Sequence, residues 1–97
     1  MNVDLKKGIV EYVGTFFFLL VILTTLYDNT LGPIAVAVAL LAVLYFSVKI
    51  SGGHINPVVS LSMFLKGKLS YSLLILYILC QVLGGITAVL LTNYLYK

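Results

Sequence analysis

Hydrophobic residues fill three long stretches of this chain, and short polar segments separate them. The stretches cover residues 8–27, 32–50 and 71–94. The hydrocarbon core of a bilayer is about 30 Å thick, and a helix needs roughly 20 apolar residues to cross it. The pattern therefore predicts three transmembrane helices, stacked in a single domain that covers residues 1–97.

The connection between the second and third stretches has an unusual pattern. It opens with the polar sequence SGGHINP and continues into a short apolar run, together covering about residues 51–65. Asn56 is a good helix N-cap, Pro57 suits the first helical position, and Gly67 between two lysines favours a stop. A helix of about 8 to 10 residues is too short to cross a bilayer. We therefore expect a re-entrant loop followed by a half-helix.

The composition places the chain in lipid. Hydrophobic residues make up 62% of the 97 residues and charged residues only 9%, so a soluble fold would be coated with apolar surface. The first stretch is too long for the core of a signal peptide, and no small-residue cleavage site follows it. The predicted fold class is all-α membrane, with the lipid bilayer as a partner.

The lysines predict an orientation. The chain has six lysines and no arginine. If the spans alternate, one side of the membrane receives Lys6, Lys7, Lys49, Lys66 and Lys68, and the other receives Lys97. Positive residues concentrate in cytoplasmic loops, so the N-terminus is expected in the cytoplasm and the C-terminus outside. Nucleic-acid binding is not expected from so few charges.

The re-entrant segment offers hydrogen-bonding groups of both kinds. Gly52 and Gly53 permit a sharp path, which leaves their carbonyls and that of His54 without helical partners. Such backbone survives at membrane depth only where it is buried in protein or lines a wet cavity. The Asn56 amide and the positive end of the half-helix supply donors and disfavour cations. The segment suits a pore for neutral, hydrogen-bonding solutes.

Three motifs carry a resemblance to a known family. They are VEYVGTF at residues 10–16, SGGHINPVVS at residues 51–60 and QVLGG at residues 81–85. In this order they resemble the first half of the aquaporin and glycerol-facilitator (major intrinsic protein) family. The resemblance spans nearly all of the chain. It implies one half of the inverted repeat from which such channels are built.

The resemblance implies pore roles for the re-entrant segment. Asn56 and Pro57 match the first of the two Asn-Pro motifs of the family, with Asn56 donating to a solute oxygen at the channel centre. The carbonyls of Gly52, Gly53 and His54 match the acceptor ladder on the cytoplasmic side. The implied function is passive conduction of water or small neutral solutes such as glycerol.

Supporting roles follow from the other two motifs. Glu11 matches the buried glutamate that holds the re-entrant loop by hydrogen bonds, and Gln81 matches the buried amide of the third helix. The pair Gly84 and Gly85 is similar to the glycines that follow that amide. Small residues at such positions favour close helix packing in membranes.

Two valines depart from the family pattern. Val58 replaces the small alanine that usually follows Asn-Pro, which adds bulk beside the motif. Val36 occupies the second-helix position that is aromatic in many filters of the family. These departures put a water-only filter in doubt and leave room for a wider opening.

A complete pore of this family needs two halves, whereas the sequence contains a single Asn-Pro motif. We therefore expect another aquaporin-like half or a homo-oligomer to complete it, unless the sequence is a fragment of a longer channel. The alternative is a non-conducting assembly or regulatory subunit of the membrane.

Other functions have less support. A cation channel is disfavoured because Glu11 is the only acid near a pore position. Enzyme activity is not expected, because no nucleophile and base or metal cluster can be assembled. One histidine and one cysteine, Cys80, suggest no metal site, disulfide or cofactor.

Overall fold

A computed structural model describes residues 1–96, which form four α-helices. These helices are α1 (Val3–Thr24), α2 (Leu31–Ser51), α3 (Pro57–Leu65) and α4 (Tyr71–Leu95). Three of them, α1, α2 and α4, are long and apolar enough to cross a membrane. The predicted all-α membrane fold is thereby confirmed. Lys97, the lysine expected on the opposite side of the membrane, lies outside the described residues.

The first helix begins and ends earlier than the apolar stretch 8–27. Its start is fixed by Asn2, whose side-chain oxygen accepts from the backbone nitrogens of Asp4 at 2.7 Å and Leu5 at 3.2 Å. Such a cap satisfies N–H groups that have no partner within the helix. The helix ends at Thr24, where the chain turns. Lys6 and Lys7 therefore belong to α1.

The turn between α1 and α2 is organised by Asp28. Its Oδ1 accepts from the backbone nitrogens of Leu31 at 2.7 Å and Thr30 at 3.1 Å. These two bonds favour the charged carboxylate, so they hold the pKa of Asp28 below its ordinary value. Pro33 lies in the first turn of α2, where no intrahelical N–H bond is lost.

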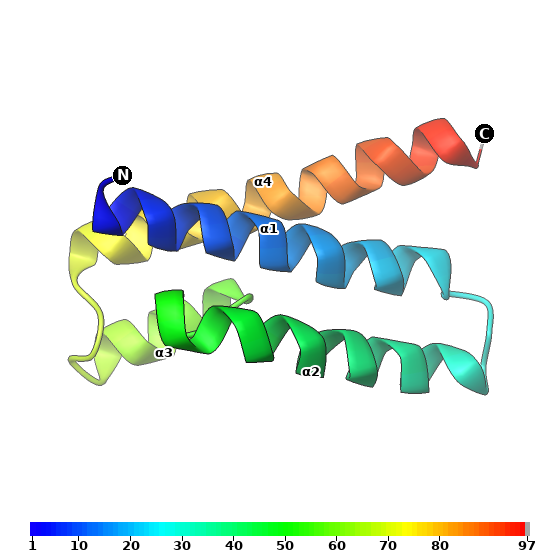
Figure 1. Ribbon diagram of the computed structural model, residues 1–97, viewed down its shortest axis with the longest axis horizontal. Helices are drawn as coiled ribbons and strands as arrows, with labels where there is room; N and C mark the ends of the chain where they lie inside the picture. Colours follow the sequence, from blue (N-terminus) through cyan, green and yellow to red (C-terminus); the bar gives the residue numbers. More distant parts are fainter. Residues whose placement is uncertain (97) are drawn as a thin grey trace.

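The half-helix α3 returns toward the end of the molecule at which α2 finishes. Figure 1 shows the chain turning back behind α2 after Ser51, and α3 then running to the same end, where α4 begins. The helices in contact are α1 with α2, α1 with α4, and α3 with α4. The segment between Ser51 and Pro57 is thereby carried into the bundle, as expected for a re-entrant loop.

Gly84 of α4 makes a close contact with α1. A β-carbon at this position would lie 2.5 Å from the backbone oxygen of Tyr12 and 3.1 Å from the nitrogen of Phe16. Glycine is therefore needed for α4 to approach α1. Nearby, the Tyr12 hydroxyl and Thr87 Oγ1 lie 2.6 Å apart and link the two helices.

Candidate functional site: the re-entrant loop and its polar support

Two glycines make the path of the re-entrant loop possible. Gly52 has φ 91° and Gly53 has φ 63°, both in the left-handed region, where side chains with a β-carbon are disfavoured. At Gly53 there is also no space, since a β-carbon would lie 2.8 Å from Val48 Cγ2 and 3.0 Å from Ser47 Oγ. The loop therefore leaves α2 along a path that only glycine fits.

A third left-handed residue, Ile55, was not foreseen from the sequence. Its φ is 59°, which is uncommon for a β-branched residue and persists only when the surroundings fix it. The side chain is only 4% exposed and reaches α1 beside Gly14, where a β-carbon would lie 2.6 Å from Ile55 Cδ1. Gly14 thus provides the space that Ile55 fills.

Glu11 of α1 is the centre of the hydrogen-bond network beneath the loop. It is fully buried. Its Oε1 accepts from the Ile55 backbone nitrogen at 2.7 Å and from Gln81 Nε2 at 2.9 Å. Its Oε2 accepts from Ser51 Oγ at 2.6 Å and from the His54 backbone nitrogen at 3.0 Å. Four donors thus offset the cost of burying this acidic side chain in an apolar protein.

The same network continues through Ser60 to the half-helix. Gln81 Nε2 donates to Ser60 Oγ at 2.9 Å, and His54 Nδ1 lies 2.9 Å from that oxygen. The His54 ring packs edge-on against Tyr77, with 4.9 Å between centroids. The Tyr77 hydroxyl donates to the backbone oxygen of Ser51. Polar contacts therefore join α1, the loop, α3 and α4.

Sequence reasoning missed three members of this network: Ser51, Ser60 and Tyr77. A signal for two of them was present. Tyr77 lies four residues before Gln81 on one helix, and Ser60 lies four residues after Asn56, so each pair shares a helix face.

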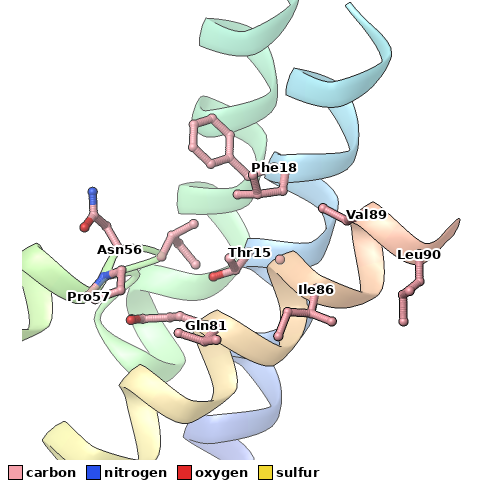
Figure 2. A pocket seen from close by; sticks show the side chains of 12 residues that line it. Thr15, Phe18, Asn56, Pro57, Gln81, Ile86, Val89 and Leu90 are labelled. Atoms are coloured by element: carbon pink, nitrogen blue, oxygen red, sulfur yellow. The ribbon is translucent and has the colours of Figure 1, made fainter. Parts of the chain in front are cut away.

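Asn56 forms the tip of α3, as its capping pattern predicted. Its Oδ1 accepts from the backbone nitrogen of Val58 at 2.8 Å, and Pro57 occupies the first turn. Figure 2 shows the amide nitrogen directed away from the loop. With the oxygen engaged by the cap, the exposed NH₂ group is left to donate to another molecule.

The loop carbonyls form a row of free acceptors. Within residues 1–96, no group donates a hydrogen bond to the carbonyl oxygens of residues 52–55. All four N–H groups of these residues are bonded. Gly52 donates to the Val48 carbonyl, Gly53 to Ser51 Oγ, and His54 and Ile55 to the Glu11 carboxylate. The loop thus directs its N–H groups into the protein and keeps its acceptors available.

Beside the tip, α1 and α4 enclose a mostly apolar hollow of about 540 Å³, which we call the Asn56 hollow. Figure 2 shows Thr15, Phe18, Gln81 and Ile86 lining it together with Asn56 and Pro57. Thr15 Oγ1 and Gln81 Oε1 are buried and have no hydrogen-bond partner within the described part of the chain. Buried polar atoms usually have a partner. The hollow therefore offers two polar atoms that could form hydrogen bonds with another molecule or segment.

The predicted site residues are only partly brought together. Gly85 lines the Asn56 hollow, whereas its neighbour Gly84 is used in the contact with α1. Val58 is 67% exposed on α3. Val36 lies on α2 in a separate hollow with Thr25 and Asp28, so the structure does not place it beside Asn56.

Three apolar spans and a half-helix that re-enters beside them define an integral membrane protein with a re-entrant loop. Comparison with known proteins identifies the family. The chain matches the family described as Major intrinsic protein over residues 2–97. It therefore belongs to the major intrinsic protein family, which confirms the resemblance predicted from its motifs.

Several curated plant proteins are similar to this chain. They include "Probable aquaporin PIP-type 7a" of Pisum sativum, 38% identical, "Aquaporin PIP1-2" of Musa acuminata, 37% identical, and "Aquaporin PIP1-1" of Oryza sativa subsp. japonica, 38% identical. Each match covers 84% of this chain, but 32%, 36% and 32% of the respective relative. The chain spans about a third of the length of these relatives. No solved structure gives a significant match.

Proposed function

We propose that this chain is half of a passive channel for water or small neutral solutes such as glycerol. A second half in the inverted orientation, supplied by another aquaporin-like segment, completes the pore. The proposal rests on the family membership and on the re-entrant loop. The observation that carries it is the orientation of the Asn56 amide.

Asn56 is suited to donate to a passing solute. Because its Oδ1 is held by the Val58 N–H at 2.8 Å, the amide cannot rotate without losing the cap. The NH₂ group therefore faces outward as a fixed donor, beside the positive end of the α3 dipole. A solute oxygen would be bound there, and a cation would be repelled.

The free carbonyls of Gly52, Gly53 and His54 provide the matching acceptors. A solute that moves along the loop could replace its hydrogen bonds to water with hydrogen bonds to these carbonyls. Within the described residues, Glu11 is the only acid near the loop. Both of its carboxylate oxygens accept hydrogen bonds from groups of this chain. We therefore propose a neutral solute, with Glu11 and Gln81 as supports of the loop.

The selectivity of the pore is proposed to be broader than that for water alone. Val36 carries no ring that could narrow an opening, and Val58 adds an apolar surface next to Asn56. Both favour solutes with carbon atoms, such as glycerol. Gly84 and Gly85 are proposed to serve packing, Gly84 against α1 and Gly85 at the wall of the Asn56 hollow.

We also propose that the N-terminus faces the cytoplasm and the C-terminus faces outward. Lys7, Lys49 and Lys68 lie near the beginning of α1, the end of α2 and the beginning of α4 respectively. This places positive charge at one end of the bundle, which is the arrangement favoured at a cytoplasmic surface. Labelling of a cysteine introduced at Asn2 in sealed, oriented vesicles tests this orientation.

The channel proposal is tested by vesicle swelling after co-reconstitution with the second half of a related family member. Asn56→Asp keeps an oxygen to accept from Val58 but replaces the NH₂ donor, so flux should fall to the background of empty vesicles. Asn56→Ala should also abolish flux, with some loss of the helix cap. Ser62→Ala, an exposed position on the same half-helix, is the control and should conduct normally. Unchanged flux in the Asn56 variants would exclude the amide from the pore.

A non-conducting assembly subunit is the second candidate. The open Asn56 hollow, with Thr15 Oγ1 and Gln81 Oε1 unpartnered, favours a role in which another membrane segment packs there. Co-purification with the second half, together with background flux, would support this candidate over the channel. Flux above background in the same vesicles would exclude it.

A further inference from the structure

A second cavity lies at the lysine-bearing end of the molecule and has a different chemistry from the Asn56 hollow. Its volume is about 590 Å³, and it opens where α1 begins, α2 ends and α4 begins. The polar residues that line it are Lys7, Ser51, His54, Lys68, Ser70 and Tyr77. We call this cavity the lysine pocket. Within the described residues its lining contains two cationic side chains and no carboxylate.

We propose that the lysine pocket binds a phosphate group, carried by an anionic lipid headgroup or by a soluble phosphate. Lys7 comes from α1 and Lys68 from the connection between α3 and α4, so two different elements each contribute a lysine to the lining. A phosphate between them gains charge-assisted hydrogen bonds from both. The binding does not depend on solute flux, and its test is independent of the channel proposal.

The start of α4 lies beside the pocket, which Ser70 and Leu73 line. Ser70 caps this helix by accepting from the Leu73 backbone nitrogen at 3.3 Å. The backbone N–H groups of Tyr71 and Ser72 have no acceptor within residues 1–96. Unpaired N–H groups at a helix start attract anions, so they reinforce the attraction of the two lysines.

Few negative charges oppose a phosphate there. Glu11 lies beneath the loop, but both of its oxygens already accept hydrogen bonds from the protein. Asp4 is the nearest acid on α1, one helical turn before Lys7, and it is exposed. Within residues 1–96, the lining itself therefore carries two cationic side chains and no carboxylate, and Asp4→Asn should strengthen binding.

The pocket also lies at the depth of lipid headgroups. Tyr71, at the first position of α4, is 66% exposed, and tyrosines and lysines at span ends mark the membrane interface. A lipid phosphate at this depth reaches the pocket without leaving the bilayer.

The experiment compares two matched pairs of lysines. Lys7→Gln with Lys68→Gln removes both pocket charges, whereas Lys6→Gln with Lys66→Gln removes two nearby charges that do not line the pocket. Native mass spectrometry of the detergent-solubilised chain would count bound dioleoyl phosphatidate, with phosphatidylcholine as the neutral lipid. Thermal unfolding with inorganic phosphate would test the soluble source. Circular dichroism would verify that each variant is folded.

We expect wild type to retain phosphatidate over phosphatidylcholine. The pocket pair should weaken retention about tenfold or more, and the control pair less than about threefold. The double variant Lys7→Arg with Lys68→Arg keeps both positive charges and should retain phosphatidate as wild type does. Stabilisation by inorganic phosphate as well would include soluble phosphates among the ligands, whereas retention of phosphatidate alone would assign the lipid. Equal losses in both pairs, or no loss in the pocket pair, would overturn the proposal.

Discussion

Glu11 Oε1 accepts a hydrogen bond from the backbone nitrogen of Ile55 at 2.7 Å. This contact joins the middle of the first span to the one non-glycine residue within 1–96 with positive φ, at 59°. The left-handed backbone of Ile55 directs its N–H toward α1, where only a buried acceptor can satisfy it. The position of Asn56, one residue later, therefore depends on a carboxylate in another helix.

The first prediction concerns removal of that carboxylate. Glu11→Leu should leave the N–H groups of His54 and Ile55 and the amide of Gln81 buried without their acceptor. Each such group costs about 1–3 kcal/mol, so we expect a loss of about 3 kcal/mol or more in unfolding free energy. Denaturant titration in detergent micelles, followed by circular dichroism, measures it. Asp4→Asn, an exposed change on the same helix, should shift stability by less than about 0.5 kcal/mol.

The second prediction compares two adjacent glycines of α4. Gly84→Ala should destabilise the protein by about 1–3 kcal/mol, because overpacking forces α4 away from α1. At Gly85 the nearest atom to an added β-carbon is Leu19 Cγ, at 3.8 Å. Gly85→Ala should therefore be neutral or stabilising by up to about 1 kcal/mol through helix propensity. Thermal unfolding of the two variants measures the difference in their stability. Equal stability would disprove the close contact of Gly84 with α1.

The third prediction separates backbone strain from lack of space. Gly53 and Gly67 both have positive φ, 63° and 75°, so alanine at either position costs about 1–2 kcal/mol. Only Gly53 is also crowded, by Val48 and Ser47, whereas a β-carbon at Gly67 meets nothing within 4 Å. Gly53→Ala should therefore be clearly the less stable variant in chemical unfolding. A reversed order would contradict the described path of the loop.

The fourth prediction concerns pH. Bonds from the Leu31 and Thr30 N–H groups hold the pKa of Asp28 below its ordinary value. The native state thus favours the carboxylate, and its stabilising contribution is complete above the ordinary aspartate pKa. As pH falls through the lowered pKa, protonation removes it. Thermal midpoints measured at stepwise lower pH should fall for wild type. They should fall less for Asp28→Asn, whose amide oxygen can accept from the Thr30 and Leu31 N–H groups without titrating.

The elements of this fold could be predicted because each has a local signal. Three apolar stretches of sufficient length give the spans. The Asn56 and Pro57 pair gives the start of α3, and Gly67 gives its end, so the expected half-helix is found with nine residues. The resemblance to the major intrinsic protein family could likewise be recognised from three short motifs.

The support of the loop could be predicted only in outline. Glu11 and Gln81 were expected from the family resemblance, but their mutual hydrogen bond and the bond from Gln81 to Ser60 depend on how α1, α3 and α4 pack. The left-handed backbone of Ile55 has no sequence signal, since β-branched residues disfavour it. Val36 was assigned by counting along the chain, and its pore role stays a prediction because the count does not determine which neighbours it meets.

The network around Glu11 also has a consequence for biosynthesis. Its hydrogen-bond donors lie 40, 43, 44 and 70 residues further along the chain. As the ribosome extends the chain, the first span is synthesised before any of these donors. An acid without partners is costly in hydrocarbon, so the earliest insertion intermediate is less stable than the finished bundle. Gln81 is the last of the four donors to be synthesised, so the carboxylate has its full set of partners only when α4 has joined the bundle.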